Sequence, residues 1–171
     1  RFYPAIHPLL SYSEYVENSA RWWQQRGGGV RWTEQRAQML ELIQEQARLE
    51  KMVKIVGRDA LPASQRLILV NAEVMVEALL RQSAFSETDR YCSPDKQIAM
   101  LRTVGDFITR AEQAVTDGID PDALLALPVT RRIRRMGEDI PNEKLELFDE
   151  LAHDLDTAFA ALVPATQAAT E

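Results

Sequence analysis

The sequence predicts an all-α protein, a helical bundle with a long antiparallel helix hairpin and a central helix. Apolar residues recur at three- and four-residue spacing over several long segments, which is typical of helices with one buried stripe. Proline and glycine separate these segments. No segment shows a persuasive alternation of apolar and polar residues, the pattern of a half-buried strand. A chain of 171 residues is the size of one domain with a single core.

The first part of the chain predicts a short helix followed by a long one. Residues 13–25 form the first pattern, and Gly27-Gly28-Gly29 ends it, because such a run costs too much backbone entropy to remain helical. The second pattern covers residues 33–56, and Gly57 supplies a left-handed cap. Its apolar stripe consists of Met39, Leu42, Ile43, Leu49, Val53 and Val56.

A hairpin is predicted around the turn Asp59-Ala60-Leu61-Pro62, in which proline breaks the helix. The next helical pattern carries a stripe of Leu67, Val70, Val74 and Ala78. Two long helices with so short a link must lie antiparallel.

A central helix is predicted from Ser93 to Gly118. Ser93-Pro94 is a strong start signal, because the serine side chain caps free amides and proline has no N–H to leave unpaired. Two apolar stripes follow, so this helix is expected to be buried from two sides; they are Ile98, Leu101, Ile108 and Val115, and Met100, Val104, Phe107, Ala111 and Ala114.

The last third predicts shorter helices. Asp120-Pro121 repeats the cap-plus-proline signal for a short helix through Leu127, and another runs over residues 129–136. A final helix has a nearly heptad pattern of Leu145, Phe148, Ala152, Leu155, Phe159 and Leu162.

We divide the chain into a lead-in segment, residues 1–12, a helical domain, residues 13–163, and a disordered tail, residues 164–171. Because it opens at Arg1 without an initiator methionine or a signal-like segment, we expect it to come from a longer protein.

Composition excludes several functions. The formal net charge of -6 argues against nucleic-acid binding, and no apolar run approaches the roughly 18 residues needed to span a bilayer. The single cysteine, Cys92, has no histidine near it in sequence to act as its base, and we predict no catalytic residue and no metal site.

His153 among the carboxylates of the last helix leaves a metal-dependent hydrolase as an alternative. Arginines 131, 132, 134 and 135 predict a solvated surface or one that binds an acidic partner.

Three aromatic residues occur near helix ends: Tyr3, Phe85 and Tyr91. Such side chains usually complete a core, but they also stack on purines without reading their edges. From composition alone, both interpretations stay open.

Several motifs resemble the C-terminal region of the catalytic A subunit, or alpha chain, of archaeal and bacterial V-type or A-type ATP synthases. The resemblance covers about residues 2–136. It is carried by Phe2-Tyr3-Pro4-Ala5-Ile6, Ser11-Tyr12-Ser13-x-Tyr15, Val56-Gly57-x-x-Ala60-Leu61-Pro62, and Ala84-Phe85 followed by Asp89-x-Tyr91-Cys92-Ser93-Pro94-x-Lys96-Gln97.

This resemblance implies a role in a rotary ATPase that couples ATP synthesis or hydrolysis to proton or sodium transport. The full-length protein is expected to bind ATP or ADP with Mg, next to the B subunit, in a cytoplasmic, peripheral sector of a membrane-bound complex. No Gly-x-x-x-x-Gly-Lys-Ser/Thr motif occurs in this chain, so alone it is expected to hydrolyse no ATP and to need no cofactor.

The resemblance also implies two functional surfaces. Tyr3, Ala84 and Phe85 fall where the family contacts adenine. Arg58, Asp59, Ala60, Leu61 and Pro62 form the turn that faces the central-stalk rotor. In the related F-type β subunit this turn is the acidic DELSEED segment, of which only Asp59 and Leu61 match here.

A free-standing helical adaptor or interaction module is the alternative function. It would explain the all-α pattern and the arginines, but it predicts an initiator methionine and leaves the aromatic positions unexplained.

Overall fold

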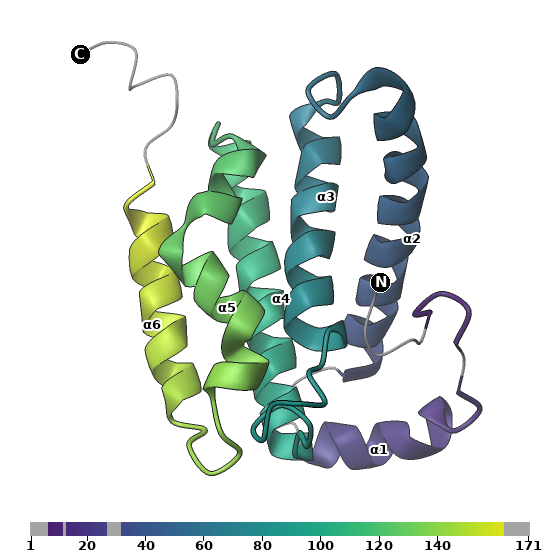
Figure 1. The fold of residues 1–171 in the computed structure, drawn as a ribbon, viewed down its shortest axis with the longest axis vertical. Helices are drawn as coiled ribbons and strands as arrows, with labels where there is room; N and C mark the ends of the chain where they lie inside the picture. Colours follow the sequence, from purple (N-terminus) through teal and green to yellow (C-terminus); the bar gives the residue numbers. More distant parts are fainter. Residues whose placement is uncertain (1–6, 12, 27–31, 163–171) are drawn as a thin grey trace.

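The computed structural model describes residues 7–11, 13–26 and 32–162, and within these ranges it is all-helical, without a strand (Figure 1). The expectations for the tail, for Gly27-Gly28-Gly29 and for residues 1–6 and 12 of the lead-in lie outside the described residues. The elements are α1 (Val16–Arg26), α2 (Trp32–Val56), α3 (Ala63–Met75), η1 (Val76–Leu80), α4 (Pro94–Thr116), η2 (Pro121–Ala126), α5 (Pro128–Asp139) and α6 (Leu147–Ala160).

The predicted hairpin is confirmed: α2 and α3 lie side by side and antiparallel (Figure 1). Gly57 ends α2 with a φ of 83°, the left-handed conformation expected of a glycine cap. The sequence did not predict that α3 continues into η1. This element is a single π-helical turn, closed by the hydrogen bond from Arg81 N to Val76 O.

The central position of α4 is also confirmed, since it contacts α2, α3, α5 and α6. One predicted stripe is buried throughout: Met100, Val104, Phe107, Ala111 and Ala114. Of the other stripe only Ile98 is buried, while Leu101, Ile108 and Val115 are half-buried. Phe107 meets Phe159 of α6 edge to face, with ring centroids 5.8 Å apart.

The last three elements close the bundle on the side of α4 away from α2 (Figure 1). Pro121 and Pro128 each stand at the first turn of their helix, η2 and α5, where a missing N–H costs little. The final helix, α6, buries Phe148, Leu151 and Leu155. The predicted apolar pattern of this helix did not include Leu151, because Leu151 lies next to a heptad position and not on one.

The first helix, α1, buries none of its side chains and lies across one end of the bundle (Figure 1). A ring stack and an ion pair between described residues link it to α2 and α4. Trp23 stacks on Trp32 of α2 with ring centroids 5.3 Å apart, and Arg26 Nε lies 2.7 Å from Asp95 Oδ1 at the start of α4.

Candidate functional site

The connection between η1 and α4, residues 81–93, is called the joint below. It is held mainly by hydrogen bonds to Asp89, whose side chain is buried. The Asp89 carboxylate accepts a hydrogen bond from Ser83 N. The backbone N–H of Asp89 donates to Ser86 Oγ at 3.2 Å. Gln82 Nε2 donates to the Asp89 carbonyl. These bonds close the segment from Ser83 to Asp89 into a compact loop.

Phe85 lies in that loop and points into solvent, because its side chain is 98% exposed. Ala84 beside it is also exposed. Both line a cleft of about 680 Å³ between the joint and α5. Four arginines line the same cleft: Arg81, Arg131, Arg134 and Arg135. The third predicted adenine contact, Tyr3, lies outside the described residues.

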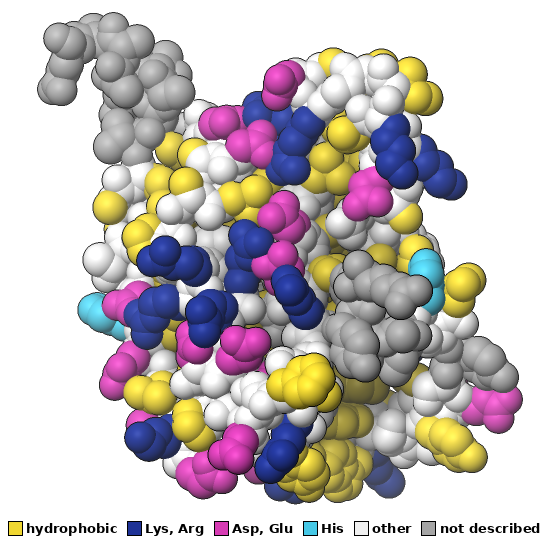
Figure 2. Space-filling view, viewed as in Figure 1, with side chains coloured by type: hydrophobic (Ala, Val, Ile, Leu, Met, Phe, Trp, Pro, Cys, Tyr) yellow, Lys and Arg dark blue, Asp and Glu magenta, His cyan; other side chains and the backbone are white. Residues whose placement is uncertain are grey.

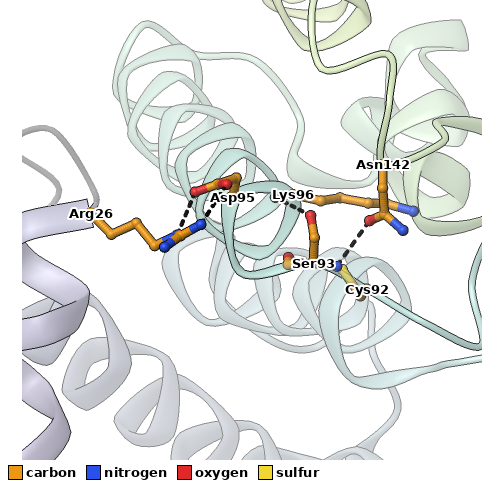
Figure 3. Close-up of polar contacts among 6 residues, drawn as sticks. All are labelled: Arg26, Cys92, Ser93, Asp95, Lys96 and Asn142. Carbon is orange, nitrogen blue, oxygen red and sulfur yellow. Dashed lines mark hydrogen bonds and ion pairs between the residues drawn. The ribbon is translucent and has the colours of Figure 1, made fainter.

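The first turn of α4 fastens the joint to other elements. Ser93 caps the helix as predicted, since its Oγ accepts a hydrogen bond from Lys96 N at 3.2 Å. Asn142 links two positions of the joint, because its Oδ1 accepts from Ser93 N and its Nδ2 donates to the Tyr91 carbonyl, both at 2.9 Å. Figure 3 shows Asn142 and Arg26 approaching this turn from opposite sides.

Two groups at this turn have shifted pKa values. The hydrogen bond from Arg26 holds the pKa of Asp95 below its ordinary value. Burial raises the pKa of the Cys92 thiol. The Cys92 Sγ lies 3.8 Å from Ser93 O and from Met100 Sδ, so this thiol is protonated and packed, as expected of a structural cysteine.

The hairpin tip divides the predicted rotor-facing residues into two groups. Asp59, Ala60 and Pro62 are exposed. Leu61 is instead buried against Leu49 and is only 6% exposed.

Arg58 also turns away from the tip. Its Nη2 lies 2.6 Å from Asp122 Oδ1 of η2, and Arg66 pairs with the same carboxylate. Near the tip, three apolar side chains of α2 form an exposed patch: Met52, Ile55 and Val56. Val56 was predicted in the buried stripe of α2 and is instead 55% exposed, while Met52 and Ile55 lie outside that stripe.

Most of the α5 arginines are paired within the chain. Arg132 pairs with Asp154 of α6, and Arg134 with Glu77 of η1. Figure 2 shows basic and acidic side chains interleaved on this face. Asp156, one of the carboxylates of α6 near His153, pairs with Arg110 of α4.

Among the residues that the structure describes, no three His, Cys, Asp or Glu side chains lie close enough to hold a metal ion. Within the same ranges, no helix combines the length and apolarity needed to cross a membrane.

Comparison with known proteins adds a family. The model of the C-terminal domain of V and A type ATP synthase matches residues 22–125. The A subunit of the A-type ATP synthase of Methanopyrus kandleri is 43% identical over 164 residues, which are 95% of this chain and 27% of that protein. The corresponding proteins of Methanospirillum hungatei and Thermococcus onnurineus are both 38% identical, over 91% and 93% of this chain and 26% and 27% of theirs.

The chain spans about a quarter of the length of these relatives. The family model covers more than half of the chain and includes both the hairpin and the joint. This chain therefore belongs to the family of C-terminal domains of the A subunits of V-type and A-type ATP synthases.

Proposed function

We propose that this domain contacts the adenine of ATP or ADP through the joint and transmits nucleotide-driven motion to a central rotor through the hairpin tip. It would do so as part of a full-length A subunit in a rotary ATPase that couples ATP turnover to proton or sodium transport. The observation that carries the proposal is the exposure of Phe85, which is 98%, at the edge of a cleft.

The position of Phe85 supports an adenine contact. A large aromatic side chain held in solvent on a hydrogen-bonded loop is prepared to stack on a planar ring, and each such stack contributes about 1–3 kcal/mol in nucleic-acid binders. Ala84 beside it leaves room for a ring to approach. We place Tyr3 in the same pocket by resemblance alone.

The phosphate-loop motif is absent from the sequence, so the Mg-bound phosphates would be held by another part of the full-length protein, beside the B subunit. ATP would then bind across a hinge. Because it would contact both sides only when the hinge is closed, its binding would favour the closed arrangement.

The hairpin tip supports a mechanical contact. Its exposed surface combines Ile55, Val56 and Ala60 with one base, Lys54, and one acid, Asp59, while Arg58 is held by Asp122. The central-stalk rotor would therefore be pushed through apolar and steric contact more than through charge pairing. In this proposal the domain lies in the cytoplasm, in the peripheral sector of the membrane-bound complex. Nucleic acid is not among its proposed partners.

The proposal is tested by measuring ATP binding to the full-length protein in complex with its B partner. We expect Phe85→Ala and Tyr3→Ala each to weaken binding about tenfold or more, which corresponds to about 1.4 kcal/mol. Tyr91→Ala is the matched control, because Tyr91 is an aromatic of the same joint, 75% exposed, that does not line the cleft. Unchanged affinity in folded Phe85→Ala protein would remove adenine from the joint and leave the domain a purely mechanical lever.

A further inference from the structure

Lys96, in the first turn of α4, is completely buried. A buried amine needs hydrogen-bond acceptors. Its Nζ donates to the carbonyl of Gly137 at 2.7 Å and to that of Thr88 at 3.5 Å. Figure 3 shows this side chain extending away from Arg26.

The Gly137 carbonyl has a specific reason to need this donor. It lies in the last turn of α5, and the residue four positions later is Pro141, which has no N–H. The carbonyl end of a helix also carries partial negative charge, which favours a lysine. Lys96 therefore supplies the hydrogen bond that the end of α5 lacks.

Asp89 approaches the same glycine from the joint. A Cβ on Gly137 would lie 2.7 Å from Asp89 Oδ1, closer than real side chains come, so only glycine admits the carboxylate there. Lys96, Asp89 and Gly137 thus bring α4, the joint and α5 together at one point. We call these three residues the clamp.

The surroundings of the joint make the clamp important. On one side lies the cleft that Phe85 lines, and on the other a cavity of about 530 Å³ lined by residues of α2, η1 and α4. Gln82 and Asp89 line both. With space on two sides, the loop has little apolar packing to fix it, and its position depends on the clamp and on the hydrogen bonds to Asp89.

We infer that the clamp is a positioning device that holds Phe85 in the orientation required for its adenine contact. This inference rests on the proposed function. Because the clamp also joins α4 to α5, a load applied to Phe85 would reach both helices directly. An apolar residue in place of Lys96 would fill the same volume but would leave the buried Gly137 carbonyl without its donor, so the variant is expected to lose stability as well as the clamp.

The test is a double-mutant cycle on ATP binding to the full-length protein in complex with its B partner. Lys96→Met keeps the length of the side chain and removes the amine. We expect it to weaken ATP binding about three- to tenfold when Phe85 is present, and by less than about 1.5-fold in the Phe85→Ala background. Lys144→Met, at an exposed lysine of the loop before α6, is the matched control and should change nothing.

Gly137→Ala is a second, milder variant that displaces Asp89 and keeps Lys96, and it should show the same dependence on Phe85. A role in folding alone would weaken binding equally in both backgrounds. That result, or unchanged affinity in both clamp variants while Phe85→Ala weakens binding, would overturn this inference and leave the adenine contact standing. If Phe85→Ala itself leaves the affinity unchanged, the adenine contact and the clamp inference both fail.

Discussion

Leu61 and Ile55 provide a direct test of how the hairpin tip is built. Leu61 is 6% exposed and packs in a small cluster with Leu49 and Leu69, whereas Ile55 is 84% exposed. Replacing a buried leucine by alanine costs about 2–5 kcal/mol. The cluster around Leu61 is small and close to solvent, so it relaxes more easily, and we expect about 2–3 kcal/mol at the lower end of that range.

The free energy of unfolding is measured by urea denaturation of the purified chain, with the melting temperature as a second observable. Leu61→Ala should lower the melting temperature by about 4–12 °C, because each 1 kcal/mol shifts a domain of this size by about 2–4 °C. Ile55→Ala should cost less than about 0.5 kcal/mol, as surface substitutions do. Equal costs for the two variants, or a loss below about 0.5 kcal/mol for Leu61→Ala, would refute the assignment of Leu61 as the internal anchor of the tip.

Two further predictions concern the head of α4. The pKa of Asp95 is lowered in the folded state by its hydrogen bond from Arg26, so the stabilisation is present above the unfolded pKa of about 4 and is lost as the pH falls through the lower folded value. Between about pH 6 and pH 2 the melting temperature of the wild type should therefore fall further than that of Asp95→Asn, and an equal fall would contradict the ion pair. For Cys92, burial raises the thiol pKa, so alkylation of the folded chain at neutral pH should be slower than in urea, with a rate midpoint above about 8.5. Cys92→Ser is the blank for this assay, and a lower midpoint would indicate an activated thiolate.

The sequence was sufficient for the features that local chemistry determines. The existence of the helix α2, the glycine cap after it and the Ser93 cap of α4 all follow from residues close together in the chain, and each is confirmed. The same local signals could not predict which long charged side chains are buried or which groups they contact. Lys96 belongs to no apolar stripe, yet it is fully buried because Pro141, 45 positions later, leaves a carbonyl of α5 without a donor.

The candidate site was predictable to the same extent. The motif around Phe85 marked the joint correctly as a separate segment, but the cleft depends on how α5 packs beside it. Arg58, predicted in the rotor-facing turn, pairs with Asp122, because η2 folds back on the hairpin. That contact joins residues 64 positions apart, and no spacing rule reports it.

The central helix gives the domain the geometry of a lever arm. Its 23 residues make a rod of about 34 Å, at 1.5 Å per residue. One end begins at the joint, and the other leads through Gly118 to η2, whose Asp122 pairs with Arg58 near the hairpin tip. A rotation of about 10° around the joint would therefore carry the far end through about 6 Å, roughly the pitch of one helical turn. If the proposed motion occurs, a small change of angle at the joint would become a displacement of about one row of side chains at the far end of α4.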